Sequence, residues 1–217
     1  MDALWEKLFR SQEWGKYPPE SVVRFVARNF YSVAERGKIR LLDAGCGPGA
    51  CTWFMAREGF QVSGIDGSPT AIQYAAERLK AEGLNADLRV GDYTSLPWSD
   101  ELFYGAIDNV SFYANLKADW QRAVDETYRV LKPGGLFFTS SFTTNTWGRN
   151  TGREVEPGSF RDIPEGPFYG RGLAHFVTES ELRDLLRHFS RVDVERECRT
   201  LVNQSKLVEL WIATAVK

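Results

Sequence analysis

Short apolar runs alternate with amphipathic helical runs along most of this chain, and no other feature restricts its fold so strongly. Between the apolar runs, apolar residues recur at helical spacing. Strands that alternate with helices form a parallel sheet covered by helices on both faces, with right-handed crossovers. The expected strands are Ile39–Asp43, Gln61–Asp66, Ala86–Val90, Phe103–Val110 and Leu136–Thr143.

The last two apolar runs break this alternation. Val192–Thr200 and Leu207–Val216 are joined by only six residues, which is too short for a helical crossover. They must therefore pair as a hairpin, and one of them runs antiparallel. The sequence predicts an α/β fold with a seven-stranded, mostly parallel sheet, helices on both faces and an antiparallel C-terminal hairpin.

A length of 217 residues fits one domain, 1–217. Within it, residues 1–36 are expected to form an N-terminal helical cap, because a short helical pattern and an aromatic loop precede Pro18-Pro19 and a second helix. Residues 144–173 are too long for an ordinary connection and have little periodicity. We expect this segment to be an insertion that covers the substrate.

A glycine-rich turn and several carboxylates mark the expected ligand site. The first strand runs through Asp43 into the turn 45–49, whose three glycines alternate with other residues. Asp66, Asp92 and Asp108 lie at or beside the ends of the next three strands. Each carboxylate alone is more often a solvated group or a helix cap. Four at the edge where open α/β sheets bind ligands indicate a binding site.

Two motifs make the chain similar to a known family. Leu41–Gly49 resembles the first motif of class I S-adenosylmethionine-dependent methyltransferases, and Val130–Gly135 resembles the motif before their fifth strand. The terminal hairpin is similar to their antiparallel last strand, so the resemblance covers roughly residues 39–216. It implies a Rossmann-like methyltransferase fold, S-adenosylmethionine as cofactor and S-adenosylhomocysteine as product.

The resemblance also implies roles for individual residues. Gly45 and its neighbours would contact the methionine part, Asp66 would hold the ribose, and Asp92 with Tyr93 would flank the adenine. The neighbourhood of Asp108 and Asn109 would face the methyl sulfonium. The full expected cofactor set is Asp43, Gly45, Cys46, Gly47, Gly49, Asp66, Gly67, Asp92, Tyr93, Asp108 and Asn109.

The same residues are compatible with other functions. Gly45, Gly47 and Ala50 also satisfy a nicotinamide-dinucleotide fingerprint, with Asp66 placed for the ribose. Asp43 would repel a pyrophosphate, and Pro48 removes one N–H from the turn, which favours a cationic ligand. A protein that binds the cofactor without transferase activity and an NAD(P)-dependent oxidoreductase remain the alternatives. An aminopropyl transferase would need a further acidic pair, which the sequence does not offer.

Methyl transfer requires positioning and alignment, and a base only where the nucleophile must lose a proton. His175 is the candidate base, although an imidazole packed beside Phe176 is the favoured interpretation. Aromatic and basic residues of the two covering segments are the candidates for binding the acceptor. They are Trp14, Tyr17, Tyr113, Arg149, Tyr169 and Arg171.

Composition restricts the partners. The net charge is −2, so the chain lacks the basic excess of a general nucleic-acid binder, and we expect a small-molecule substrate. No apolar run reaches the ~18 residues needed to span a bilayer, which predicts no membrane association and a cytoplasmic location. The three cysteines have no metal-ligand spacing, so no metal is expected. The chain is expected to be a monomer or homodimer.

Overall fold

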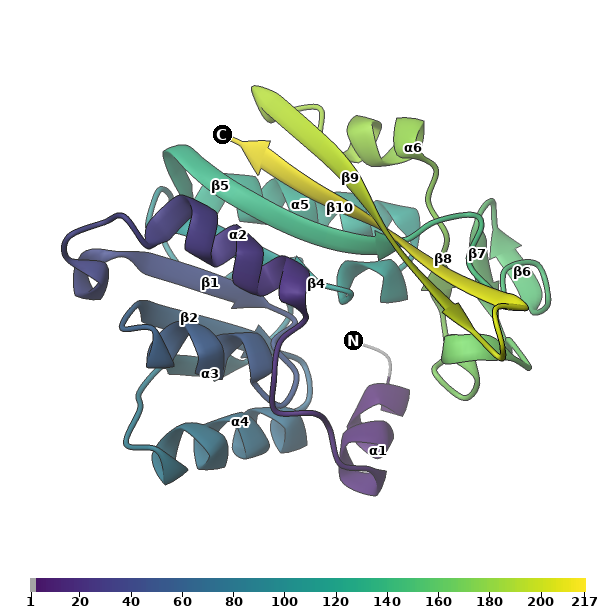
Figure 1. Cartoon of the computed structure of the whole chain (residues 1–217), viewed down its shortest axis with the longest axis horizontal. Coiled ribbons are helices and arrows are strands. Elements are labelled where there is room, and N and C mark those ends of the chain that lie inside the picture. Colours follow the sequence, from purple (N-terminus) through teal and green to yellow (C-terminus); the bar gives the residue numbers. More distant parts are fainter. Residues whose placement is uncertain (1–2) are drawn as a thin grey trace.

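A seven-stranded sheet in the order β3-β2-β1-β4-β5-β10-β9 runs through the computed structural model, which describes residues 3–217 (Figure 1). The five strands from β3 to β5 are parallel, and β10 lies antiparallel between β5 and β9. The expected α/β fold with its antiparallel hairpin is therefore confirmed. The strands are β1 (Arg40–Ala44), β2 (Gln61–Asp66), β3 (Asp87–Val90), β4 (Phe103–Asn109), β5 (Leu131–Phe142), β9 (Arg191–Leu201) and β10 (Lys206–Val216).

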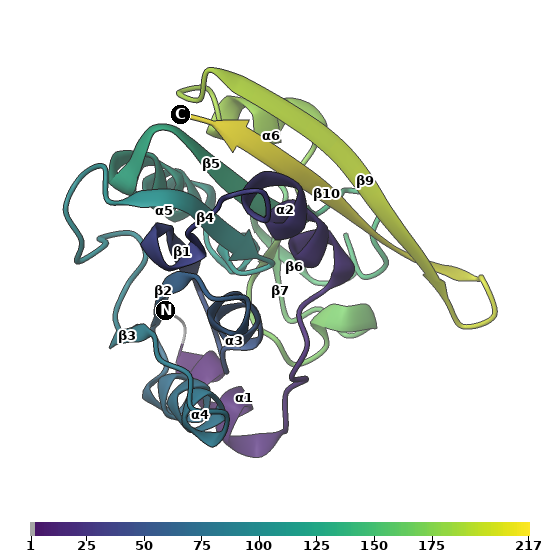
Figure 2. The same ribbon diagram turned by 60° about the vertical axis from the view of Figure 1, so that its left-hand side comes forward.

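Helices cover both faces of the sheet (Figures 1 and 2). Helices α2, α3 and α4 pack on one face, and α5 and α6 pack on the other. Helix α1 stands apart from the sheet and contacts α4. The helices are α1 (Ala3–Ser11), α2 (Glu20–Phe30), α3 (Ala50–Arg57), α4 (Pro69–Ala81), α5 (Lys117–Val130) and α6 (Glu179–Leu185), with short 3₁₀ turns at Arg36–Lys38, Phe112–Ala114 and Gly166–Phe168.

Local sequence signals explain where two of these helices begin. The Ser68 hydroxyl accepts a hydrogen bond from the amide of Ala71 at the start of α4, and Pro69 occupies the first helical position. At the start of α6, Thr178 Oγ1 accepts from the amide of Glu181. The Glu181 carboxylate turns to Lys117 and His175, so it serves tertiary contacts as well as the helix start.

The fifth strand starts earlier than the sequence predicts. We expected a strand from Leu136 after a break at Pro133-Gly134-Gly135, but β5 begins at Leu131, directly after α5. The pairing with β4 shifts from Phe103↔Leu131 to Gly105↔Leu136, so the segment between forms a bulge. A bulge accepts Pro and Gly inside a strand because its residues leave the regular hydrogen-bond ladder.

Close packing fixes α2 against the sheet. The rings of Phe25 and Phe138 lie 5.3 Å apart, and the ring of Phe30 covers Gly105. A Cβ at Gly105 would lie 2.7 Å from that ring, so only glycine fits beneath it. Each such buried aromatic side chain contributes about 1.5–3 kcal/mol through burial alone.

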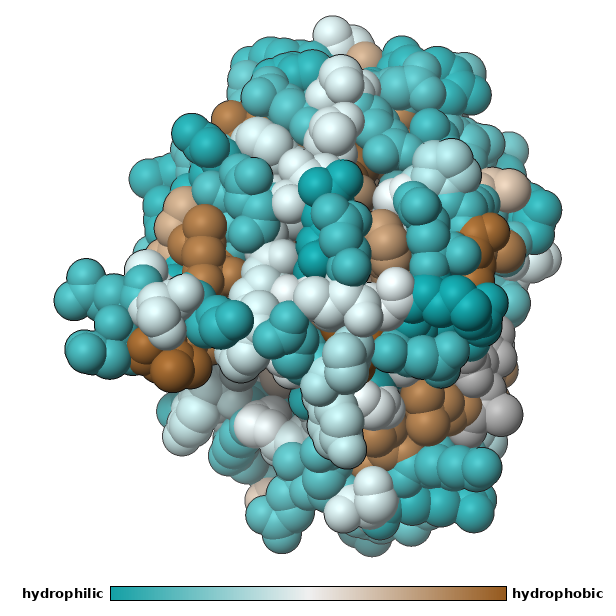
Figure 3. Space-filling model, turned by 90° about the vertical axis from the view of Figure 1, so that its right-hand side faces the viewer, coloured by the Kyte–Doolittle hydropathy of each residue, from teal (hydrophilic) through white to brown (hydrophobic). Residues whose placement is uncertain are grey.

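The segment 144–173 contains structure that the sequence did not predict. Together with the two residues after it, it forms a small antiparallel sheet of β6 (Arg153–Glu156), β7 (Ser159–Arg161) and β8 (Ala174–His175). These strands are too short to give an alternating pattern. Figure 3 looks onto the face that carries the small sheet, which is mostly hydrophilic with scattered hydrophobic patches. Over residues 3–217, the structure has no helix of the length and apolarity that a bilayer crossing requires.

Candidate cofactor and substrate site

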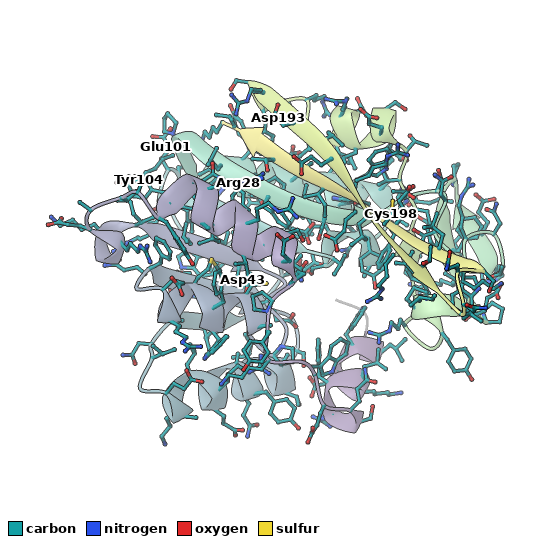
Figure 4. All side chains as sticks on the ribbon, in the orientation of Figure 1. Arg28, Asp43, Glu101, Tyr104, Asp193 and Cys198 are labelled. Atoms are coloured by element: carbon teal, nitrogen blue, oxygen red, sulfur yellow. The ribbon has the colours of Figure 1, made fainter. Side chains whose placement is uncertain are left out.

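A cavity of about 440 Å³ opens at the carboxyl ends of β1 and β4. Its size is typical of small-molecule sites. One wall consists of the turn after β1 and the ends of β2 and β4, including Asp43, whose position on β1 is labelled in Figure 4. The other wall consists of side chains from the N-terminal segment, the loop after β4, and Phe142, Pro167 and Arg171. The two walls differ in chemistry.

The backbone N–H groups of the glycine-rich turn donate hydrogen bonds to other groups of the protein. Pro48 has no N–H, and each of the other four residues of 45–49 donates to a nearby oxygen. A pyrophosphate needs free amides at such a turn, and none of these is free. The four bonds are Gly45 and Cys46 to the Ile65 carbonyl (2.8 and 3.0 Å), Gly47 to the Asp66 carboxylate (2.9 Å) and Gly49 to the Cys46 carbonyl (2.9 Å).

Gly45 brings the turn into contact with the loop after β4. Its φ is +76°, and a Cβ placed on it would lie 1.8 Å from Ser111 Oγ. Only glycine combines this conformation with this approach. The contact keeps the ends of β1 and β4 close together at the floor of the cavity.

Asp66 lies at the end of β2 and is only 7% exposed. Its two carboxylate oxygens accept one N–H each, from Gly47 and Ser68 (both 2.9 Å). Burial raises the pKa of Asp66. Each oxygen keeps capacity for a further donor, so the group can accept the two hydroxyls of a sugar diol.

Asp43 is the second carboxylate in the wall. Its side chain is 2% exposed and accepts a 2.6 Å hydrogen bond from Thr52 Oγ1 on α3. Burial raises the pKa of Asp43 to about 6. A buried carboxylate stabilises a cationic group beside it and repels an anion.

The opposite wall is aromatic. Trp5, Phe9 and Trp14 form a cluster in which Phe9 and Trp14 lie 5.1 Å apart and Trp5 and Trp14 lie 6.3 Å apart. The guanidinium of Arg171 stacks 5.0 Å from the Trp14 ring. Aromatic side chains with one cation suit a flat, partly polar ligand. Tyr17, Tyr113 and Phe142 complete this wall.

Helix α4 fixes the N-terminal segment in place. Glu6 accepts hydrogen bonds from the hydroxyls of Ser68 and Thr70 at the start of α4. These bonds lower the pKa of Glu6 to about 2. Arg78, further along α4, donates to the carbonyls of Trp14 and Gly15, at 3.3 Å each. The aromatic wall is thus tied to the helix that follows Asp66.

Comparisons with known proteins show the family to which the chain belongs. Residues 41–135 match the family described as "Methyltransferase domain". The chain is 30% identical over 179 residues to a 2-heptyl-1-hydroxyquinolin-4(1H)-one methyltransferase of Mycobacteroides abscessus, covering 78% of this chain and 67% of that protein. The chain is a class I S-adenosylmethionine-dependent methyltransferase.

Two further relatives show how broad this methyltransferase family is. A tRNA N(3)-methylcytidine methyltransferase of Schizosaccharomyces pombe is 25% identical over 227 residues, covering 97% of this chain and 71% of that protein. A solved S-adenosylmethionine-dependent methyltransferase from Methanosarcina mazei superimposes with a TM-score of 0.71 at 26% identity, covering 88% of this chain and 96% of that chain. The recognised family and the expected cofactor are confirmed, and the oxidoreductase alternative is wrong.

The cofactor wall of the methyltransferase fits S-adenosylmethionine. Asp66 offers two buried acceptor oxygens for a ribose, and Asp43 offers negative charge for an amino or sulfonium group. Gly45, Cys46, Gly47, Gly67, Tyr93 and Asn109, all expected cofactor residues, also lie in the wall. The amides of the turn already donate within the protein, which is compatible with a ligand that has no phosphates.

The structure places Asp108 behind the cavity wall and not in it. This carboxylate is fully buried and lies outside the cavity wall, where it accepts from the amides of Ser111 and Phe112 and from Thr139 Oγ1 (2.9, 3.1 and 2.7 Å). Burial raises the pKa of Asp108 to about 7. Asp108 therefore positions the loop that carries Asn109, and Asn109 itself reaches the wall.

Two other expected cofactor residues also lie outside the wall. Gly49 has a φ of +78° and starts α3 against Ala75 of α4, so its function is local packing. Asp92 is exposed and accepts from the amide and hydroxyl of Thr94 (2.8 and 2.7 Å). A contact of Asp92 with the adenine stays a prediction.

His175 is not placed to act as a base in the methyltransferase. Its imidazole is fully buried on β8, outside the cavity wall. Nδ1 lies 2.6 Å from Ser159 Oγ, and Nε2 lies 3.3 Å from Glu181 Oε1. The sequence favoured a packed imidazole hydrogen-bonded to backbone; the imidazole is packed, with the Trp120 ring 5.5 Å away, but its partners are side chains.

The covering segment supplies fewer cavity residues than expected. Arg149 donates to the carbonyl of Thr144 at 3.4 Å, and Tyr169 is 74% exposed. Neither lies in the wall, whereas Trp14, Tyr17, Tyr113 and Arg171 do. The sequence missed Trp5, Phe9, Phe142 and Pro167; only the i,i+4 spacing of Trp5 and Phe9 offered a signal, for a shared helix face.

Proposed function

We propose that this methyltransferase transfers the methyl group to a small molecule bound against the aromatic wall. One observation carries the proposal: a single continuous cavity has two strand-end carboxylates at one side and aromatic side chains at the other. The first side suits the cofactor, and the second leaves an apolar place for an acceptor beside it.

In this proposal the strand ends hold the cofactor. Asp66 accepts the ribose hydroxyls, the turn at Gly45 and Asp43 contacts the methionine part, and Tyr93 lies beside the adenine. Asn109, held by the Asp108 loop, faces the reacting region. When bound, S-adenosylmethionine supplies a methyl group that is already activated for transfer. The protein then needs to align the acceptor and exclude water.

The two segments outside the sheet are assigned to the acceptor. Residues 1–36 act as a cap, with Trp14 and Tyr17 over the cavity. Residues 144–173 act as a cover, which reaches the cavity through Pro167 and Arg171. We take both segments and the sheet as one domain, 1–217, because all three contribute side chains to the same cavity wall.

Charge supports a small acceptor over a nucleic acid. The chain carries a net charge of −2, and within residues 3–217 the cavity wall includes one cationic side chain, Arg171. A nucleic-acid methyltransferase needs several cations along its substrate's backbone. The relative named for a quinolinone acts on a small ring system, whereas the relative named for tRNA is the competing precedent.

A two-step experiment tests the proposal. Calorimetric titration with S-adenosylhomocysteine first establishes cofactor binding. Release of S-adenosylhomocysteine from S-adenosylmethionine is then measured with a panel of small aromatic and aliphatic acceptors and, separately, with bulk tRNA. Turnover with a small molecule and none with tRNA is expected. Turnover with tRNA alone would overturn the proposal.

A further inference from the structure

We propose that the acceptor is a planar aromatic compound that binds as an anion, with an ionised ring hydroxyl as the nucleophile and Arg171 as its counter-ion. This inference rests on the proposed function and narrows its substrate class. Three independent properties of the acceptor side support it: the shape of its wall, its unpaired polar groups and its lack of a base.

The wall favours a flat ring. Trp14, Tyr17, Tyr113 and Phe142 come from three separate parts of the chain and meet at one side of the cavity. Rings that line a site prefer offset or edge-to-face contacts with another ring. The Tyr113 and Phe142 rings already meet edge to face, with centroids 4.8 Å apart. An aliphatic acceptor would use little of this geometry.

Arg171 is the only cation in the cavity wall among residues 3–217, and it forms no ion pair with any of them. Within the wall its guanidinium stacks on the Trp14 ring, 5.0 Å away, and its charge also acts on the Tyr113 hydroxyl. Arg129, another half-buried arginine, pairs with Glu126 (2.8 Å), and the half-buried Arg78 and Arg149 donate to backbone carbonyls. A half-buried, unpaired guanidinium in a cavity is a site for an anion.

The indole of Trp14 provides a second unused donor. Its Nε1 is buried and has no hydrogen-bond partner within the described chain. A buried N–H without a partner costs about 1–3 kcal/mol. Toward the cavity, Trp14 thus contributes a ring with a cation above its face.

The acceptor side offers no base at neutral pH. Within residues 3–217 the wall includes no His, Lys or Glu, and its two carboxylates, Asp43 and Asp66, belong to the cofactor side. Burial raises the pKa of Tyr113 to about 12, so this phenol stays protonated. A neutral hydroxyl would have no side chain to take its proton, whereas an ionised hydroxyl needs none.

The transfer balances without proton movement. The ring oxygen's lone pair forms the new O–CH₃ bond while the methyl–sulfur bond of the sulfonium breaks, and the bonding pair goes to sulfur. An anion and a cation become a neutral methyl ether and a neutral thioether. The methylated product no longer pairs with Arg171, which favours its release.

The test measures binding rather than turnover. The protein is saturated with S-adenosylhomocysteine, and equilibrium dialysis then gives its affinity for 4-nitrophenol, which ionises near neutral pH, and for its neutral methyl ether, 4-nitroanisole. Affinity for 4-nitrophenol should rise with the ionised fraction and exceed that for 4-nitroanisole. Arg171→Gln should lower the anion's affinity about 10- to 100-fold and leave 4-nitroanisole unchanged.

Arg153→Gln is the matched control, because Arg153 lies exposed in the same covering segment outside the cavity wall. It should leave both affinities unchanged. Equal binding of the two probes, or an anion preference that survives in Arg171→Gln, would overturn the inference. Failure to bind S-adenosylhomocysteine would instead overturn the proposed function, so the two failures are distinguishable.

Discussion

The two walls of the cavity are built in different ways. The cofactor wall is part of the sheet's own edge. It consists of a turn whose amides bond to Ile65 and Asp66, and of carboxylate side chains buried where strands end. The acceptor wall consists of side chains: Phe142 at the end of β5, Tyr113 from the loop after β4, and N-terminal rings held by contacts of Glu6 and Arg78 with α4 and the chain around Trp14. The first wall follows directly from the sheet, whereas the second depends on segments added to it.

This difference predicts different responses to mutation. Substitutions in the cofactor wall should disturb folding and cofactor affinity together, because the same hydrogen bonds serve both. Substitutions at the less buried residues of the acceptor wall, such as Trp14 and Tyr17, should leave stability and cofactor affinity nearly unchanged and affect only the acceptor. The following experiments test this contrast, from the largest expected effect to the smallest.

Removing the Asp66 carboxylate should have the largest effect. Asp66→Ala should weaken S-adenosylhomocysteine binding by about 100-fold or more, because two hydrogen bonds to a charged group are lost. Asp66→Asn keeps one acceptor oxygen, so its affinity for S-adenosylhomocysteine should lie between those of Asp66→Ala and the wild type. Calorimetry measures both affinities. Unchanged affinity in Asp66→Ala would show that the carboxylate does not hold the ligand.

A pair of glycines separates backbone strain from close approach. Gly45 and Gly134 share a φ of +76°, but a Cβ at Gly134 meets nothing within 4 Å. Gly134→Ala should cost about 1–2 kcal/mol of unfolding free energy through strain alone. Gly45→Ala should cost about 1–3 kcal/mol more, since it also collides with Ser111, and should weaken S-adenosylhomocysteine binding. Urea unfolding and calorimetry measure the two effects; equal losses would contradict this account.

Buried carboxylates behind the cofactor wall should make stability pH-dependent. The native pKa of Asp108 is raised to about 7 and that of Asp43 to about 6, above the 3.8 of an unperturbed aspartate. The native state therefore binds more protons than the unfolded state between these values, and stability is lost as pH rises from about 4 to about 7.

Urea unfolding of the cofactor-free protein should show this fall between pH 5 and pH 7, amounting to at most a few kcal/mol. Asp108→Asn should flatten the curve, because the group that gains the proton is gone. A stability that rises over this range in the wild type would contradict the assignment.

Substitution of Trp14 tests whether the acceptor wall affects acceptor binding independently of cofactor binding. Trp14→Ala should reduce the affinity for 4-nitrophenol about tenfold while S-adenosylhomocysteine affinity stays the same, since the ring packs against Trp5, Phe9 and Arg171 of the acceptor wall. Trp14→Phe keeps a ring without the donor and should recover part of the loss. An equal loss of cofactor affinity would show that the two walls are not separate.

The smallest effect is expected at two equally exposed tyrosines, of which only one lies in the cavity wall. Tyr17 and Tyr169 are 73% and 74% exposed, but only Tyr17 lies in the cavity wall, edge to face on Trp53 at 5.5 Å. Tyr17→Ala should weaken 4-nitrophenol binding about two- to fivefold. Tyr169→Ala should have no effect. An effect of Tyr169→Ala alone would mean that the cover closes differently over a bound acceptor.

The sequence by itself determined the sheet and the cofactor end of the site. Alternating runs predicted the strands, and the spacing of Gly45, Gly47 and Asp66 predicted the turn and its carboxylate, because these features depend on residues close in the chain or at the ends of adjacent strands. The bulge at 132–135 was not predicted, since its register depends on pairing with β4.

Only the tertiary structure decided which polar residues face the cavity and what builds the acceptor wall. Asp108 and Asn109 are neighbours in the chain, yet one is buried behind the loop and the other reaches the cavity, because successive strand residues point to opposite sides. Arg171 and His175 are only four positions apart in the chain, yet Arg171 lies in the cavity wall and His175 is buried outside it. The cavity wall brings together Trp5, Phe142 and Arg171, which span more than a hundred residues of the chain. Such long-range packing produces no local sequence pattern from which it could be predicted.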